Sequence, residues 1–161
     1  MDGNDIGDGI TLRAEQAGDA AFVDALTRGQ LGEGLGGLMD GPLLEMQLRS
    51  RAATLAHRFP DLGREVAWMG DAPVGSLLTT PLGGTLHVVE IIIVPAWRRQ
   101  GLARRMLEAV IRRATADGRD VTAMIYVSNT ASLALFSTCG FSLERADGEA
   151  QTTARLRTRH N

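Results

Sequence analysis

The segment from Leu86 to Ala116, LHVVEIIIVPAWRRQGLARRMLEAVIRRATA, constrains the fold more than any other part of the chain. Its first part, residues 88–94, is apolar apart from Glu90 and rich in β-branched side chains, which is typical of a buried strand. A proline follows and ends the strand, because proline cannot donate a hydrogen bond to a sheet ladder. Beyond a short basic turn, apolar residues recur at steps of three and four, which predicts a helix over residues 102–117. The expected order is therefore strand, basic turn, helix.

The turn between this strand and this helix has the sequence Arg98-Arg99-Gln100-Gly101-Leu102-Ala103. The first N–H groups of a helix lack intrahelical partners, and the helix dipole favours negative charge there. Gly101 and Ala103 are small, so a ligand can approach the backbone closely. Basic residues at a helix N-terminus oppose the dipole when no anion is bound. The turn therefore predicts a phosphate-binding site, and the alternative is a solvated helix start whose arginines bind nothing.

Two sequence blocks resemble those of the GCN5-related N-acetyltransferases, the GNAT superfamily. The first is Arg98-x-x-Gly101-x-Ala103 after a strand that ends in Val94-Pro95, which is similar to the acyl-CoA signature of that family. The second block consists of Asn129, Leu135-Phe136 and Gly140-Phe141. The resemblance extends over about residues 74–141 and is strengthened by the strand-to-helix context of the first block.

The resemblance implies an enzyme that transfers an acetyl or other short acyl group from acetyl-CoA, its co-substrate, to a primary amine. The amine attacks directly in a ternary complex, and no metal takes part. The expected acceptor is a small-molecule amine or an amine of a peptide or protein, and a homodimer is one expected assembly. The residues assigned to acetyl-CoA are Ile92, Ile93, Val94, Arg98, Arg99, Gln100, Gly101, Leu102, Ala103, Arg104, Asn129 and Phe136.

Glu90 is the candidate catalytic base. It interrupts an apolar strand, and burial raises the pKa of a carboxyl group toward neutrality, which suits proton transfer. In the family this strand position often holds a base, and backbone N–H groups near Ile92 meet the acyl oxygen. The alternatives for Glu90 are a solvent-facing side chain or an ion pair with an arginine. His87 is the second candidate for the base, but in a regularly alternating strand it faces away from Glu90 and Val88, as a surface histidine does.

Phe136 stands where many members of the family carry a tyrosine that acts as general acid. Phenylalanine donates no proton, although a thiol of pKa about 8.5 leaves as an anion near neutral pH without help. The residue therefore keeps a second function open, that of a non-catalytic acyl-CoA-binding sensor or regulatory protein with the same fold. Glu90 argues against this alternative.

The order of the patterns predicts an α/β (α+β) fold with a mixed, mostly antiparallel sheet of about seven strands and helices on both faces. The resemblance adds that the central strands, 85–94 and 121–127, splay apart, with a bulge in the first. We expect residues 1–9 to form a flexible N-terminus and residues 10–161 a single acyltransferase-like domain. The predicted strands are 10–14, 64–69, 74–80, 85–94, 121–127, 141–144 and 151–157, and the predicted helices are 20–26, 42–57, 102–117 and 130–139.

Composition limits the partners and the compartment. The net charge is −2, which disfavours a nucleic-acid-binding protein, and no apolar run approaches membrane-spanning length, which disfavours a membrane partner. The acidic, polar N-terminus has no pattern of a signal peptide. Cys139 is the only cysteine, so the chain cannot form an internal disulfide, and a reducing, cytoplasmic location is expected.

Overall fold

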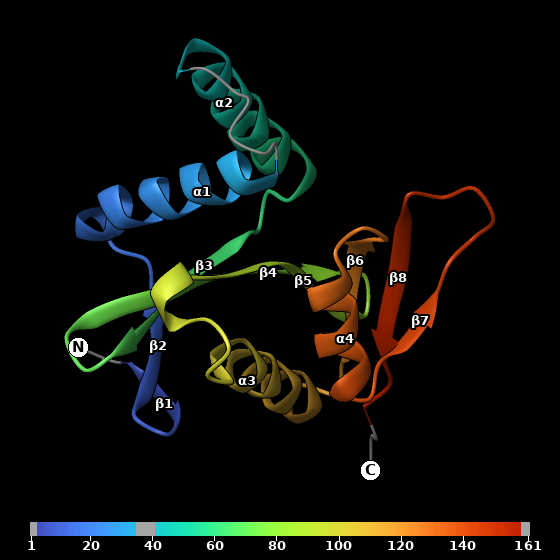
Figure 1. Cartoon of the computed structure of the whole chain (residues 1–161). Helices are drawn as coiled ribbons and strands as arrows, with labels where there is room; N and C mark the ends of the chain where they lie inside the picture. The colour runs from blue at the N-terminus through green and yellow to red at the C-terminus, as the bar shows by residue number, and fades with distance from the viewer. Residues whose placement is uncertain (1–2, 35–40, 159–161) are drawn as a thin grey trace.

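The computed structural model describes residues 3–34 and 41–158, and within them one eight-stranded sheet carries helices on both faces. Figure 1 shows α1 and α2 above the sheet and α3 and α4 below it. The strands are β1 (Asn4–Gly7), β2 (Ile10–Ala14), β3 (Gly63–Met69), β4 (Ala72–Leu82), β5 (Thr85–Ile93), β6 (Asp120–Tyr126), β7 (Ser142–Glu144) and β8 (Gln151–Leu156). The helices are α1 (Ala20–Gly34), α2 (Gly41–Arg58), α3 (Leu102–Ala116) and α4 (Thr130–Thr138), with 3-10 turns at Ala17–Asp19 and Pro95–Trp97.

The sheet has the order β1-β2-β3-β4-β5-β6-β8-β7. Neighbouring strands pair antiparallel, with the single exception among the described strands of the parallel pair β5 and β6. The mixed, mostly antiparallel α/β fold predicted from the sequence is thereby confirmed. No helix in the described part of the chain has the length and apolar character needed to cross a membrane.

Helix α3 packs its predicted apolar face on the sheet. The apolar residues that recur every three or four positions are buried, namely Leu102, Met106, Leu107, Ala109, Val110 and Ala114. They form one cluster with residues of β4, β5, β6 and α4. Because this face is fixed in the core, the N-terminus of α3 is held against the end of β5, where the basic turn connects them.

Strand β5 contains a bulge at Val89. Leu78 of β4 pairs with Glu90, but the next residue, Thr79, pairs with Val88, so Val89 is an additional residue in β5. A bulge shifts the alternation of side chains by one position beyond it. The side chains on either side of Val89 therefore do not follow the regular alternation that the sequence suggests.

Strands β5 and β6 splay apart. They pair only where Thr85–Val88 lies beside residues 120–123. Beyond that point β5 continues to Ile93 and β6 to Tyr126 without pairing to each other. The expected bulge and splay are both present, and they open a gap in the middle of the sheet.

The N-terminal region differs from the prediction. Asn4–Gly7 forms β1, which pairs with β2, so the expectation of a flexible segment over residues 1–9 is wrong for these residues and the sheet has eight strands rather than seven. Asp8 and Gly9 have φ values of 54° and 79°, which suit a two-residue turn, and Ile6 is buried. The Asp-Gly pair is a hairpin signal that the sequence contains.

Helix α1 extends further than expected. It ends at Gly34 rather than near residue 26. Residues 29–41, GQLGEGLGGLMDG, contain six glycines and are expected to resist regular structure, but their first part, up to residue 34, is helical. The rest of that run up to residue 40 lies outside the described residues. The sequence also predicts that Asp40, with Pro42, starts the second helix, and Asp40 lies outside the described residues as well.

Candidate active site

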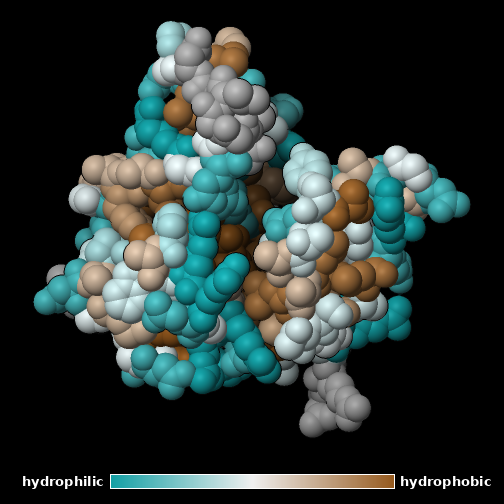
Figure 2. All heavy atoms as spheres, viewed as in Figure 1, coloured by the Kyte–Doolittle hydropathy of each residue, from teal (hydrophilic) through white to brown (hydrophobic). Residues whose placement is uncertain are grey.

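A cleft of about 750 Å³ lies where β5 and β6 splay apart. It is lined by residues of α1, α2, β5, β6 and α4, and by Ala103 at the start of α3. Figure 2 shows the surface hollowed between the part formed by α1 and α2 and the part formed by β6 to β8, with hydrophobic side chains inside the hollow. Among the predicted site residues, Glu90, Ala103, Asn129 and Phe136 line this cleft together.

Glu90 projects from β5 toward α2, where Nη2 of Arg51 donates a hydrogen bond to its Oε1 at 2.6 Å. The side chain of Glu90 is 15% exposed, so the carboxylate is partly shielded from water. Burial raises the pKa of Glu90, and the charge and hydrogen bond of Arg51 oppose this effect in part. The predicted buried carboxylate and the alternative of an arginine ion pair are thus both present.

His87 lies on the same side of the sheet as Glu90, contrary to the prediction. Both residues line the cleft, and the ring of His87 lies 5.9 Å from the ring of Phe59, which follows α2. The bulge at Val89 causes this, because the additional residue reverses the alternation between positions 87 and 90. His87 is also 6% exposed and so is not a surface histidine, and burial, aided by the charge of Arg58, lowers the pKa of its imidazole.

The basic turn has the backbone of an anion-binding loop. Gly101, the residue before α3, has a φ of 80°, and Arg99 has a φ of 62°, an uncommon value for a residue with a side chain. Left-handed residues in such a turn direct successive N–H groups to one side and form a nest for anions. The strain at Arg99 is of the kind that occurs at ligand-binding turns.

Arg98 of the turn and Arg104 of α3 have protein partners. Arg98 donates to Glu33 of α1 at 3.0 Å and, through Nε, to the carbonyl oxygen of Ile93 at 3.3 Å. Arg104 donates to Glu108 one helical turn further along at 3.0 Å. The contacts of Arg98 bring the basic turn and the C-terminal end of α1 together over the end of β5.

The end of β5 is fixed by backbone hydrogen bonds. The N–H of Val94 donates to the carbonyl of Val74 at 2.9 Å, and the carbonyl of Val94 accepts from the N–H of Trp97 at 2.8 Å. Any further bond to the Val94 carbonyl uses its second lone pair. The backbone roles assigned to Ile92 and Ile93 stay predictions.

Asn129 and Phe136 place α4 against the cleft. The side chain of Asn129 accepts a hydrogen bond from the N–H of Ser132 at 3.1 Å, so it caps α4 while also lining the cleft. Phe136 is 4% exposed and packs edge-on against Phe141, with ring centroids 4.9 Å apart. Its ring fills the wall of the cleft without offering a proton.

Sequence reasoning missed Arg51 and Thr122. Arg51 contacts Glu90 from 39 residues away, and Thr122 contacts His87 from 35 residues away. No local pattern marks such pairs, because each forms only when α2 or β6 packs beside β5. Tyr126, at the end of β6, also lines the cleft. Within the described residues, no group of three or more histidine, cysteine or carboxylate side chains is arranged to hold a metal ion.

The sequence matches the model of the acetyltransferase (GNAT) family over residues 41–141. This range contains the bulged strand, the basic turn, α3 and α4. No curated protein matches the chain by sequence.

Solved structures share the fold over nearly the whole chain. The PaiA N-acetyltransferase of Thermoplasma acidophilum in complex with coenzyme A matches with a TM-score of 0.74 and 12% identity, covering 92% of this chain and 98% of that one. YncA of Salmonella typhimurium, an acetyltransferase structure with acetyl-CoA, has a TM-score of 0.63 and 18% identity, with 96% of each chain covered. Spermidine N-acetyltransferase of Vibrio cholerae, with CoA and spermine, has a TM-score of 0.64 and 19% identity, covering 92% and 94%.

Proposed function

The chain belongs to the acetyltransferase (GNAT) family, and we propose that it transfers an acetyl group from acetyl-CoA to a primary amine by direct attack in a ternary complex. The observation that carries this proposal is the position of Glu90. Its partly buried carboxylate lies in a cleft that extends from α2 to the start of α3. Such a cleft offers one end to an amine and the other to a phosphate-bearing co-substrate.

The co-substrate end is formed by the basic turn and α4. The turn supplies the unpaired N–H groups at the start of α3, and Arg98, Arg99 and Arg104 supply positive charge for the pyrophosphate. Gly101 has nothing within 4 Å of the position where a Cβ would be, so the backbone there is open to a ligand. Structural neighbours with coenzyme A or acetyl-CoA support this assignment.

At the other end of the cleft, the acceptor amine must lose its proton before it can attack. Glu90 accepts that proton, because its raised pKa makes it a stronger base than an exposed glutamate. Backbone N–H groups near Ile92 stabilise the oxyanion that forms on the acyl carbon. The CoA thiolate then leaves without a general acid, since Phe136 occupies the wall beside it.

The acceptor class is a primary amine of a small molecule, a peptide or a protein. The neighbour from Vibrio cholerae is a spermidine acetyltransferase, and another neighbour, RimL, acetylates the α-amino group of a ribosomal protein. Glu33 and Glu45 form exposed ion pairs with Arg98 and Arg28, so a cationic amine would compete with these arginines for their carboxylates. The single cysteine, Cys139, supports placing the reaction in the cytoplasm.

A non-catalytic acyl-CoA-binding protein is the second candidate, and Phe136 is the observation that favours it. Such a protein would keep the basic turn and lack turnover. The two candidates make different predictions for Glu90, because a sensor has no need of a carboxylate beside the acyl group.

A two-stage experiment tests both candidates. Thermal-shift titration with acetyl-CoA, with desulfo-CoA and ATP as controls, measures binding, because a ligand specific for the folded state raises Tm. Release of free thiol with a panel of primary amines then measures turnover of the wild type, of Glu90→Gln and of the control Glu144→Gln on β7. We expect a shift selective for CoA compounds, and a loss of turnover of about 10²-fold or more in Glu90→Gln alone. No shift at millimolar acetyl-CoA overturns the proposal, and a shift without any turnover favours the sensor.

A further inference from the structure

We propose that His87 is a second proton acceptor in the cleft, held by Thr122 in the tautomer that presents Nε2 to the acceptor amine. This inference rests on the proposed function and deepens it. It assigns a role to a buried histidine that the acetyl-transfer reaction, as described above, does not use.

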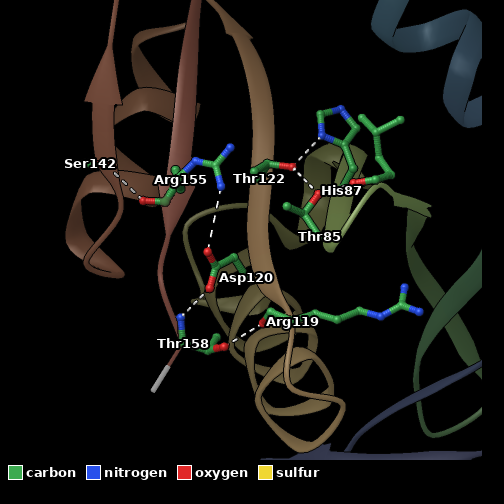
Figure 3. Close-up of polar contacts among 9 residues, drawn as sticks. Thr85, His87, Arg119, Asp120, Thr122, Ser142, Arg155 and Thr158 are labelled. Atoms are coloured by element: carbon green, nitrogen blue, oxygen red, sulfur yellow. Dashed lines mark hydrogen bonds and ion pairs between the residues drawn. The ribbon is translucent and has the colours of Figure 1, made fainter. Parts of the chain in front are cut away.

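A chain of hydrogen bonds fixes the tautomer of His87, and Figure 3 shows its members side by side on β5 and β6. The hydroxyl of Thr85 donates to the carbonyl oxygen of Leu82 at 2.8 Å, and a hydroxyl has only one proton to donate. Thr85 must therefore accept in its 3.2 Å contact with the hydroxyl of Thr122. Thr122 has then used its own proton and must accept from Nδ1–H of His87 at 2.9 Å.

The second ring nitrogen of His87 is free and reaches the cleft. Among the described residues, the buried side-chain nitrogen and oxygen atoms without a hydrogen-bond partner are Nε of Arg13 and Nε1 of Trp68. Nε2 of His87 also makes no hydrogen bond with the described residues, but it is not among these buried atoms. Part of the surface of this nitrogen is therefore exposed. In Figure 3 this nitrogen points away from Thr122. With Nδ1 protonated, neutral His87 carries its lone pair on Nε2, where it can accept a proton.

The surroundings of His87 keep the ring neutral. The charged and titratable groups that share its cleft are Arg51 and Arg58 of α2, Glu90 of its own strand and Tyr126 of β6. Burial and the charge of Arg58 both disfavour the imidazolium. A neutral ring can accept a proton, whereas a charged ring cannot.

The chemistry of amide formation gives two proton acceptors a use. An alkylammonium has three N–H bonds and the amide product has one, so two protons must leave the nitrogen for each acyl transfer. One is lost before attack, when an N–H bond breaks and an O–H bond forms on Glu90. The other is lost after the C–N bond forms, when the second N–H bond breaks and an Nε2–H bond forms on His87 as the C–S bond breaks. One proton then combines with the released thiolate and the other passes to solvent through the mouth of the cleft.

Glu90 and His87 are suited to different parts of this sequence. Oε1 of Glu90 is occupied by Arg51, which holds the carboxylate beside β5. Nε2 of His87 has no such competitor. Thr122 is a positioning residue, because it acts on the amine only through the orientation of the ring.

The experiment compares His87→Gln and Thr122→Val with Thr152→Val. Thr152 is a buried threonine of β8, and the hydrogen bond of His87 goes to Thr122 and not to it. Long-range ¹H–¹⁵N NMR of histidine-labelled protein reads the tautomer without acetyl-CoA or amine. We expect Nδ1–H for His87 in the wild type and Thr152→Val, and a mixture of tautomers in Thr122→Val. An Nε2–H tautomer in the wild type overturns the proposal directly.

Turnover is the second readout. We expect kcat to fall about 10²-fold in His87→Gln and less in Thr122→Val, with the acid limb of the pH profile displaced in Thr122→Val and acetyl-CoA binding unchanged in both. If His87→Gln does not fold, the pH profile of turnover by Thr122→Val still tests the role of His87. If neither variant changes turnover at any pH, the proton-accepting role of His87 is overturned while the proposed acetyl transfer stands. A wild type that acetylates no amine refutes the proposed function, and the role of His87 with it, whatever the tautomer.

Discussion

Nη2 of Arg51 lies 2.6 Å from Oε1 of Glu90 and thereby joins α2 to the central strand of the sheet. The two side chains are 27% and 15% exposed, so the pair is shielded from water but not sealed. Burial and the arginine act in opposite directions on the carboxyl group, and burial has the larger effect. The pair therefore adjusts how strong a base Glu90 is as well as where it lies.

Replacing Arg51 should shift the pH dependence of turnover. Arg51→Met removes the charge that lowers the pKa of Glu90, so that pKa rises further. Because a proposed base such as Glu90 acts in its ionised form, we expect the acid limb of kcat/KM to move to higher pH by about one unit. The matched control is Arg28→Met, which removes an arginine that joins α1 to Glu45 and not to Glu90. An acid limb at the same pH in both variants, or one moved to lower pH, would show that Arg51 does not act on the base.

Glu33 should compete with acetyl-CoA for Arg98. The two side chains are 3.0 Å apart and largely exposed, and exposed ion pairs contribute about 0.2–1 kcal/mol. Glu33→Gln weakens this competition, so we expect acetyl-CoA to bind tighter by up to about fivefold. Isothermal titration of Glu33→Gln and of the control Glu45→Gln, whose partner is Arg28, measures the difference. Equal or weaker binding by Glu33→Gln would mean that Arg98 does not contact the pyrophosphate.

The elements with the strongest periodic patterns were predictable from the sequence. The apolar face of α3 is buried as expected, and α3 and α4 begin where predicted, at Leu102 and Thr130. These predictions succeed because each depends on local spacing, on a glycine or on a capping side chain such as Asn129. The Asp8-Gly9 turn carried a comparable signal for β1, but the polar residues around it obscured the strand.

The candidate site was less predictable because its geometry depends on register and on long-range packing. One additional residue, Val89, reverses the alternation of β5 and brings His87 to the side of Glu90. The position of the bulge is set by how β4 pairs with β5. The sequence of β5 alone does not determine this pairing. The partners Arg51 and Thr122 depend in the same way on where α2 and β6 come to lie.

Gly75 should tolerate no side chain. A Cβ at this position would lie 2.7 Å from the carbonyl oxygen of Ile92, which is backbone and cannot rotate away. We expect Gly75→Ala to lower stability by about 1–3 kcal/mol and Tm by about 5 °C, and to reduce turnover by displacing the strand that carries Glu90. The control is Gly84→Ala, since nothing lies within 4 Å of a Cβ there. Thermal unfolding of the two variants gives the comparison, and equal Tm values would contradict the close contact.

His87 should make the folded protein less stable at acid pH. Its pKa in the folded state is lowered from 6.5 by burial and Arg58, so below about pH 6.5 the unfolded chain binds the proton more readily. The free energy of unfolding should therefore fall as the pH drops from about 6.5 toward the folded-state pKa, by at most about 1.4 kcal/mol per pH unit. Urea unfolding between pH 5 and 8 should show this slope in the wild type and in His57→Gln, an exposed control on α2, but less of it in His87→Gln. The raised pKa of Glu90 makes its contribution to stability change with pH in the opposite direction. Because Glu90 is present in all three proteins, differences between their curves report the contribution of the His87 imidazole. An identical slope in His87→Gln and wild type would show that the ring gains its proton as easily in the cleft as in the unfolded chain.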